Sequence, residues 1–301
     1  MAQFRVAPDA DGTRVDHLVA ASVPGLSVAA ARRLVAAGAV RVDGRPARKG
    51  TRLEAGQVVE VDDASREREG GDARRVQPDP SLPLAILRVD EAFIAIDKPS
   101  GLPSHPQAAG ELGTAANALV ARYPECAAAS PDPREGGLVH RLDTGTSGVL
   151  IAARDPAAWA ALRGALSAAS CEKTYLAEVT GAPDDLGGSS APIGRVGRRG
   201  ARVRTDGGRN PLAAHTSWEV VERRAETALV RVQINKGRTH QVRVHLASAG
   251  HPIVGDAIYG AAAGGGIGLR LHAAAVRFVH PATGEAILIE APPPDWAKMQ
   301  A

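Results

Sequence analysis

Short apolar runs of strand length dominate this chain of 301 residues and limit the folds that it can adopt. Fewer segments have the 3.6-residue period of an amphipathic helix. Because the strands outnumber the helices, we expect an α+β domain with a large mixed, mostly antiparallel sheet. The apolar runs lie at 84–89, 93–96, 175–179, 216–221, 229–234, 276–279 and 287–289, and the helical segments at 114–122, 157–166 and 239–249.

A polar segment separates this region from the start of the chain. Residues 63–80 read DASREREGGDARRVQPDP, in which Val76 is the only large apolar residue. Such a composition buries too little apolar surface to fold. The sequence therefore predicts a first domain at 1–62, a flexible linker at 63–80 and a second domain at 81–301.

The first domain combines a short helix with a hairpin. Ser27 is a good N-cap for an Ala-rich helix that carries Arg32 and Arg33, and Gly38 is suited to follow its end. The pair Asp43-Gly44 is a strong signal for a tight hairpin turn, and a later strand is expected at 58–61. Residues 1–61 hold nine Lys and Arg against six Asp and Glu, and so the whole net charge of +3. This excess favours a polyanion partner, although a solvated surface explains it almost as well.

Composition argues against several classes of protein. No apolar stretch approaches the length of a membrane span, and the first residues lack the apolar core of a signal peptide, so we expect a cytoplasmic protein with no membrane contact. Cys126 and Cys171 are isolated and are expected to be reduced packing residues. Neither a phosphate-binding glycine loop nor a dinucleotide fingerprint is present, so no cofactor is expected.

The run HRLDTGTSG at 140–148 places one carboxylate, Asp143, between an arginine and a Gly/Thr loop. Apolar residues at 138–139 and 149–151 predict two strands that meet at this turn and lift the carboxylate out of a sheet. The simplest alternative is an ordinary Asp-Thr-Gly turn. Another is an aspartic protease, which needs two such loops so that two carboxylates share one proton. This chain has a single loop of that kind.

A second cluster, at 235–246, follows a predicted strand and opens a helix that Thr239 can cap and Gly250 can end. On this helix Arg243 can point into a cleft and pair with Asp143, which would keep the carboxylate ionised and oriented. The alternative is a surface ion pair of little energetic value. A metal site is not expected, because His140, His240 and His245 lack the spacing of a zinc site.

Arginines also gather at 195–204, in the run RVGRRGARVR. Such a loop can follow phosphates without reading sequence, although a solvated hairpin tip explains it comparably well.

Together these segments resemble the RluA-type pseudouridine synthases. The motifs are HRLDTGTSGVL at 140–150, EKTYLAEVTG at 172–181 and GRTHQVRVHLASAGHPIVGDAIYG at 237–260, with DKPSGLPSHP at 97–106 and LRLHA at 269–273 as flanking segments. The resemblance extends over about 84–292, and residues from about 13 to 61 resemble an S4 domain in which Asp43-Gly44 replaces the usual Asn-Gly. Lys236 and the arginine-rich run depart from the family pattern.

The resemblance implies roles for individual residues. Asp143 would be the nucleophile, Tyr175 would stack on the target base and assist removal of the C5 proton, and Arg243 would pair with the carboxylate. Arg141 would help displace the base, and Leu271 would form the apolar wall under the uracil. The residues expected around the substrate also include His140, His240 and Arg238, and those expected on the RNA are Arg32, Arg33, Arg198 and Arg199.

We therefore expect an RNA pseudouridine synthase that isomerises uridines in structured RNA, most simply large-subunit ribosomal RNA, by base flipping and an Asp nucleophile. Attack on the sugar C1′, attack on C6 of the ring and removal of a ribose proton all stay open. The sequence indicates no obligate protein partner. The alternative is a non-catalytic RNA-binding or ribosome-assembly factor, in which Asp143 would be dispensable.

Overall fold

The computed structural model describes residues 2–23, 26, 28–62, 75–197, 202–260 and 267–299. The chain divides into two compact units, Met1–Gln77 with Ala108–Glu111 and Pro78–Gln107 with Leu112–Ala301. Outside the described residues lie the proposed helix cap Ser27, the arginines Arg198 and Arg199, and most of the predicted linker. The linker boundaries therefore stay a prediction. Among the described residues, no helix is both long and apolar enough to cross a membrane.

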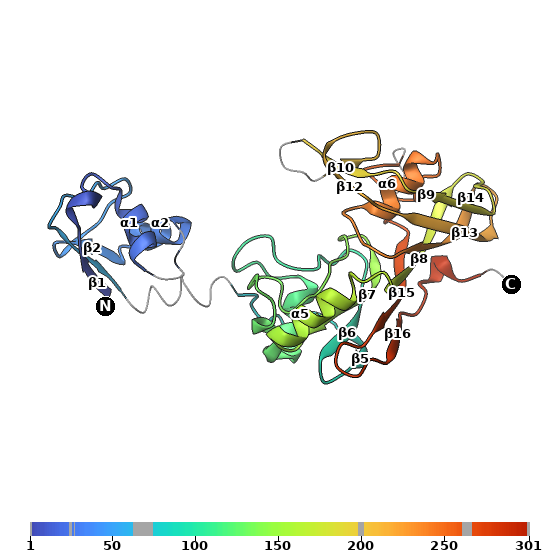
Figure 1. Cartoon of the computed structure of the whole chain (residues 1–301), viewed down its shortest axis with the longest axis horizontal. Helices are drawn as coiled ribbons and strands as arrows, with labels where there is room; N and C mark the ends of the chain where they lie inside the picture. Colours follow the sequence, from blue (N-terminus) through green and yellow to red (C-terminus); the bar gives the residue numbers. More distant parts are fainter. Residues whose placement is uncertain are drawn as a thin grey trace. The chain divides into compact units, whose positions relative to one another are not determined.

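The first unit, blue in Figure 1, pairs a four-stranded antiparallel sheet in the order β1-β4-β2-β3 with two helices. Apolar residues of the helices and of β2 and β4 form its core, among them Val19, Leu34 and Val59. Its elements are β1 (Ala2–Arg5), the 3-10 turn η1 (Pro8–Ala10), α1 (Val15–Ser22), α2 (Val28–Ala36), β2 (Val40–Val42), β3 (Arg45–Pro46) and β4 (Val58–Val61).

The predicted hairpin turn of this unit is confirmed. Asp43 and Gly44 have φ values of 48° and 76°, the left-handed conformation that a two-residue type I′ turn requires at both positions. Val42 pairs directly with Arg45 across the turn. Gly38, with φ of 74°, follows the end of α2 as expected.

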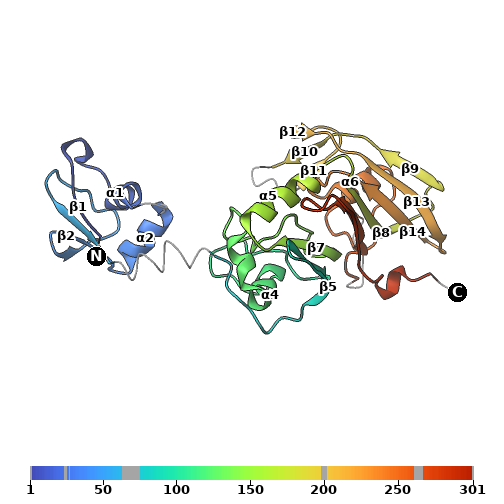
Figure 2. The ribbon, with the colours of Figure 1, turned by 60° about the horizontal axis from the view of Figure 1, so that its bottom comes forward.

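The second unit is built on a nine-stranded sheet in the order β5-β6-β7-β15-β8-β14-β13-β9, with β16 paired to β15 (Figures 1 and 2). In this sheet β7 and β15 pair in parallel and the other pairs are antiparallel, so the expected mixed, mostly antiparallel sheet is confirmed. Its strands are β5 (Ala85–Val89), β6 (Phe93–Lys98), β7 (Ser147–Ala153), β8 (Glu172–Thr180), β9 (Leu186–Ser189), β13 (Thr216–Arg223), β14 (Thr227–Ile234), β15 (Leu271–Val279) and β16 (Ala286–Glu290). A separate three-stranded sheet contains β10 (Ile193–Val196), β11 (Arg202–Arg204) and β12 (Arg209–Leu212).

Two helices cover different halves of the large sheet. Leu162 of α5 packs in one core cluster with Phe93 and Ile151 of β6 and β7. Val242 and Leu246 of α6 pack in another cluster with residues of β8 and β14. The helices of this unit are α4 (Ala115–Arg122), the 3-10 turn η3 (Pro124–Ala128), α5 (Pro156–Ala165), α6 (Gln241–Ser248) and the 3-10 turn η4 (Asp295–Ala297).

Two local predictions near the site were wrong. Residues 138–139 do not form a strand, since Leu138 makes only an isolated bridge to Ala152, and the positive φ of Gly136 and Gly137 interrupts the extended backbone just before it. Thr239 does not cap α6. The N-cap residue is His240, in a left-handed conformation with φ of 53° and without a capping side-chain hydrogen bond.

Candidate active site

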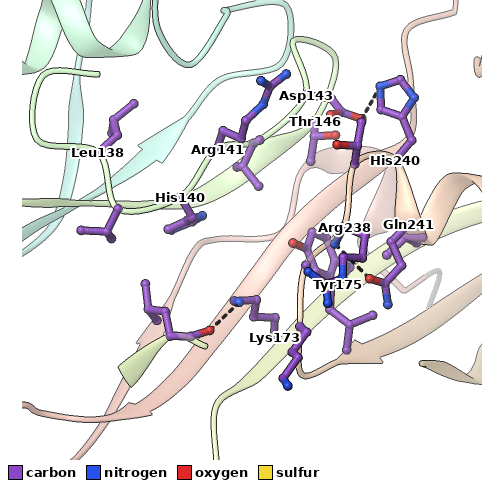
Figure 3. Close-up of a pocket in the computed structure, with 18 of the residues that line it drawn as sticks. Leu138, His140, Arg141, Asp143, Thr146, Lys173, Tyr175, Arg238, His240 and Gln241 are labelled. Atoms are coloured by element: carbon purple, nitrogen blue, oxygen red, sulfur yellow. Dashed lines mark hydrogen bonds and ion pairs between the residues drawn. The ribbon is translucent and has the colours of Figure 1, made fainter. Parts of the chain in front are cut away.

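A cavity of about 530 Å³ lies over the centre of the large sheet. The loop before β7, the strand β8, the start of α6 and the first residue of β15 all contribute to its lining, because β7, β15 and β8 are neighbours in the sheet. Figure 3 shows the side chain of His240, at the start of α6, directed toward that of Asp143 in the loop before β7. The predicted residues that line it are His140, Arg141, Asp143, Tyr175, Arg238, His240, Arg243 and Leu271.

Arg243 joins two carboxylates at this cavity. Its Nη1 donates to Oδ2 of Asp143 at 2.7 Å, and its Nε and Nη2 donate to the two oxygens of Asp256 at 2.8 Å each. Asp256 also accepts hydrogen bonds from the backbone N–H groups of Ile258 and Tyr259. The guanidinium is therefore fixed from behind by one carboxylate and presented to the other.

Burial distinguishes this arrangement from a surface ion pair. The side chains of Arg243 and Asp256 are 8% and 0% exposed, whereas that of Asp143 is 22% exposed. Burial lowers the pKa of Arg243, but the hydrogen bonds to Asp256 and Asp143 outweigh it and raise that pKa above its ordinary value. For Asp256 the signs are opposite. Burial raises its pKa, but the hydrogen bonds from Arg243 and from the Ile258 N–H group outweigh burial, so the pKa of Asp256 is below its ordinary value.

The two oxygens of Asp143 have different surroundings. Oδ2 accepts the Arg243 hydrogen bond and lies 3.7 Å from Nε2 of His240. Among the described residues, none donates a hydrogen bond to Oδ1. Oδ2 is thus anchored, whereas Oδ1 makes no hydrogen bond to a described residue.

The loop that carries Asp143 is fixed by its backbone. Thr146 N donates to the Asp143 carbonyl at 3.0 Å, which closes the turn. The fully buried Lys98 donates its Nζ to the carbonyls of Thr144 and Leu102, and Ser104 Oγ donates to the Leu142 carbonyl. Burial lowers the pKa of Lys98 to about 8, although the charges of Asp143 and Asp97 act in the opposite direction.

Tyr175 and Leu271 form walls of the cavity from adjacent strands. Tyr175 lies on β8 opposite Ala273 of β15, two residues beyond the buried Leu271. Burial, and then the charge of Asp143, raise the pKa of Tyr175 above its ordinary value. The phenol is therefore protonated at neutral pH and offers a ring face and a hydroxyl.

His140 lies on the same cavity with a fixed protonation state. Its Nε2 accepts a hydrogen bond from Ile151 N at 3.1 Å, so a neutral ring carries its proton on Nδ1. Burial, followed by the charges of Lys173 and Arg163, lowers its pKa to about 3. Arg141, in contrast, is exposed at the cavity and donates no hydrogen bond to a described residue.

Comparisons with known proteins agree with this geometry. Residues 92–248 match the family described as RNA pseudouridylate synthase, and residues 13–59 match the S4 domain. The chain is 38% identical over 307 residues to the ribosomal large subunit pseudouridine synthase D of Xanthomonas campestris, which covers 96% of this chain and 88% of the relative. The chain belongs to the RNA pseudouridylate synthase family.

Further relatives extend over a similar length. The ribosomal large subunit pseudouridine synthase C of Escherichia coli O157:H7 is 34% identical, with 97% of this chain and 93% of the relative covered. The solved structure of human RNA Pseudouridylate Synthase Domain Containing 1 has a TM-score of 0.57 and 26% identity, with 72% of this chain and 86% of that chain covered. The protein is thus an RNA pseudouridine synthase, an isomerase with an S4 domain, and the aspartic-protease alternative was wrong.

Two residues beside this cavity have no role predicted from the sequence. Asp256 and Tyr259 belong to the segment GDAIYG, but their importance depends on contacts that the fold creates with Arg243 and His240. In the sequence, the feature that could have pointed to these two residues is this segment, in which a carboxylate and a phenol are close together. Of the arginines expected on RNA, Arg32 donates to Asp16 at 2.6 Å with its side chain 51% exposed, and Arg33 is exposed.

Proposed function

We propose that this RNA pseudouridine synthase acts on large-subunit ribosomal RNA, with Asp143 as its nucleophile and a flipped uridine as its substrate. The ion-paired chain Asp256–Arg243–Asp143 beside Tyr175 is the observation that carries this proposal. The names of the relatives support the RNA class, since both the D and the C enzymes are described as ribosomal large subunit pseudouridine synthases.

The proposed reaction uses the free oxygen of Asp143. Oδ1 attacks C1′ of the ribose, the C1′–N1 bond breaks, and its electron pair leaves with the uracil ring. The ring turns, C5 forms a bond to C1′, and the carboxylate leaves with the electron pair of the ester bond. C5 then loses its proton and N1 gains one, so the product is an isomer of the substrate.

The cavity fits such a substrate in size and chemistry. Its volume of about 530 Å³ lies within the range of roughly 300–1,000 Å³ that is usual for ligand pockets. Tyr175 offers a stacking face, Leu271 an apolar wall and Arg141 an exposed cation. A base inside a duplex must leave its stack to reach such a cavity, which is why base flipping belongs to the proposal.

The test is the isosteric substitution Asp143→Asn. Tritium released from C5 of labelled uridine in large-subunit RNA measures turnover, and filter binding measures RNA affinity. We expect Asp143→Asn to release no tritium above background while it binds RNA like the wild type. Asp184→Asn, which changes an exposed carboxylate that does not line the cavity, is the matched control and should keep full activity. Turnover by Asp143→Asn at the wild-type rate would refute the nucleophile assignment.

A further inference from the structure

His240 occupies a special place beside the proposed nucleophile. It is the N-cap residue of α6, and its backbone adopts the left-handed conformation that few residues other than glycine accept readily. This conformation brings its ring to the cavity, where Nε2 lies 3.7 Å from Oδ2 of Asp143 (Figure 3). Strained backbone of this kind persists where the surrounding structure holds it, often at functional sites.

The other ring nitrogen of His240 is held by a hydrogen-bond chain. Nδ1 lies 2.9 Å from the hydroxyl of Tyr259, and that hydroxyl accepts a hydrogen bond from Val203 N at 3.0 Å. The ring of Tyr259 also packs edge-on against His240 and lies 5.4 Å from the Arg243 guanidinium. The chain therefore runs from β11 through Tyr259 to His240.

This chain selects one form of the imidazole. A hydroxyl that already accepts from Val203 completes its bonding by donating its own proton, and only an unprotonated nitrogen can accept that proton. The proton of the neutral ring is then on Nε2, on the side of Asp143. The negative charge of the carboxylate favours the same form, because it attracts an N–H group and repels a lone pair.

The charge of the ring agrees with this arrangement. Burial lowers the pKa of His240 below its ordinary value, although the charge of Asp143 raises it in part. The neutral ring is thus the form present at neutral pH. It offers an N–H dipole to the carboxylate without adding a second full positive charge beside Arg243.

We propose that His240 is a positioning residue for Asp143, held in its Nε2–H form by Tyr259 and the backbone of β11. Together with Arg243 it keeps Oδ2 as the anchored oxygen and so leaves Oδ1 as the reacting one. At 3.7 Å the N–H group acts on the carboxylate by electrostatic attraction, because that distance is too long for a hydrogen bond. This inference rests on the proposed role of Asp143 and goes beyond it by assigning functions to His240, Tyr259 and Val203.

The tautomer itself can be observed. In full-length protein with ¹⁵N-labelled histidine, two-bond ¹H–¹⁵N spectra at neutral pH report which ring nitrogen carries the proton. We expect His240 to carry it on Nε2 in the wild type and to show a mixture of both forms in Tyr259→Phe. A wild-type ring protonated on Nδ1 would overturn the proposal.

Kinetics test whether the arrangement matters for the reaction. The variants are His240→Leu, which removes the donor, His240→Gln, whose amide keeps an N–H group near the Nε2 position, Tyr259→Phe, and the double variant His240→Leu with Tyr259→Phe. Tyr123→Phe is the matched control, since Tyr123 does not line the cavity. The readouts are the single-turnover rate at saturating RNA and the RNA Kd.

We expect His240→Leu to lower the rate by about tenfold with an unchanged RNA Kd, because the electrostatic attraction that it removes is weaker than a hydrogen bond to a charged group. His240→Gln should recover a large part of that loss. Tyr259→Phe should be slower by about 3- to 10-fold in the wild-type background and by less than about twofold in the His240→Leu background, because it acts through the imidazole.

Three outcomes would overturn the inference. They are a wild-type rate for His240→Leu, a His240→Gln variant no faster than His240→Leu, or an equal effect of Tyr259→Phe in both backgrounds. If His240→Leu does not fold, Tyr259→Phe still tests the inference. A wild-type rate for Tyr259→Phe would contradict a role for the hydrogen-bond chain through Tyr259 to His240. Failure of the proposed function is distinguishable, because it would appear as activity in Asp143→Asn, whereas failure of this inference alone leaves Asp143→Asn inactive.

Discussion

At the scale of the residue, a tyrosine can contribute to pseudouridine formation in two ways, by accepting a proton at its hydroxyl or by stacking its ring on the uracil. The surroundings of Tyr175 distinguish between them. Burial and the charge of Asp143 raise the pKa of Tyr175, so at neutral pH its phenol is protonated and cannot readily accept a proton. Its ring, in contrast, lines the cavity and is available for stacking. We therefore propose that Tyr175 contributes mainly by stacking on the target uracil.

This assignment makes a prediction for two substitutions. Tyr175→Phe keeps the ring and should retain the single-turnover rate within about threefold. Tyr175→Leu should lose on the order of 5- to 150-fold, because stacking of a base on an aromatic side chain contributes about 1–3 kcal/mol. Tritium release under single-turnover conditions measures both. A Tyr175→Phe variant as slow as Tyr175→Leu would show that the hydroxyl is the essential group.

The residues of the site were predictable to different degrees. Asp143, Tyr175 and Arg243 were predicted because each stands in a distinctive motif. Asp256 was not assigned, because its role arises only when the turn after α6 brings its carboxylate behind Arg243. The same is true of Lys98, a cation in a strand whose burial under the Asp143 loop no sequence pattern reveals.

At the scale of the element, the parallel pairing of β7 with β15 supports the loop that carries Asp143. Gly148 pairs with Ala273 there, and its φ of +107° is outside the range that other residues adopt readily. A Cβ atom at this position would lie 2.2 Å from the Ala273 carbonyl oxygen, a backbone atom that cannot move away cheaply.

Gly148→Ala should therefore destabilise the protein by at least about 3 kcal/mol, since overpacking and backbone strain add. A fall in Tm of roughly 6–12 °C is expected for a unit of this size. Gly284→Ala is the control, because Gly284 also has a positive φ but nothing lies within 4 Å of the point that a Cβ atom would occupy there. Equal losses of Tm in the two variants would contradict the close-approach explanation.

The helices of the first unit depend on a buried carboxylate. Asp16 is 2% exposed and accepts hydrogen bonds from Arg14 and Arg32. Burial raises its pKa, but these two arginines outweigh that effect and lower the pKa to about 2. Arg32, which was expected to contact RNA, thus also has a structural partner.

A lowered pKa gives a definite sign to the pH dependence of stability. The ionised form stabilises the fold, so the contribution is fully present above the ordinary pKa of 3.8 and is lost as the pH falls toward about 2. Hydrogen exchange of α1 and α2 in the full-length protein should show Asp16→Asn less protected by about 1–3 kcal/mol at neutral pH. That difference should shrink in acid, and a constant difference would contradict the account.

Elements were predicted where apolar periodicity and turn residues agreed. The helices packed on the large sheet, its strands other than β9, and the turn at Asp43-Gly44 were predicted in this way. The helix α1 was missed because Arg14 at its N-cap position makes no capping hydrogen bond, and β9 and β12 were missed because glycines and a proline weaken their strand pattern. The strands β9 and β12 form because they pair with β13 and β10, and such pairing depends on the tertiary fold.

At the scale of the whole molecule, the chain joins an S4 domain to a pseudouridine synthase unit, and we propose that the first raises affinity as a second RNA contact. Arg33 and Arg45 are exposed on that unit. Structured RNA has paired and unpaired segments, so each phosphate contact that is lost should reduce the magnitude of the slope of log K against log salt concentration by about 0.7–0.9.

The double variant Arg33→Ser with Arg45→Ser should therefore bind large-subunit RNA more weakly, with the magnitude of the salt slope reduced by about 1.4–1.8. Its single-turnover rate at saturating RNA should equal that of the wild type, because the cavity is unchanged. Arg223→Gln, which removes an exposed arginine paired with Asp185, is the control. An unaltered salt slope in the double variant would exclude these arginines from RNA contact.

The central claim is that the enzyme isomerises uridines of large-subunit ribosomal RNA with Asp143 as its nucleophile. This claim can be tested in the cell. Carbodiimide treatment and primer extension map pseudouridines in ribosomal RNA from a deletion strain that carries no copy, the wild-type gene or Asp143→Asn. We predict that specific stops vanish on deletion, return with the wild type and stay absent with Asp143→Asn. Stops that return with Asp143→Asn, or a pattern that the deletion leaves unchanged, would contradict the account.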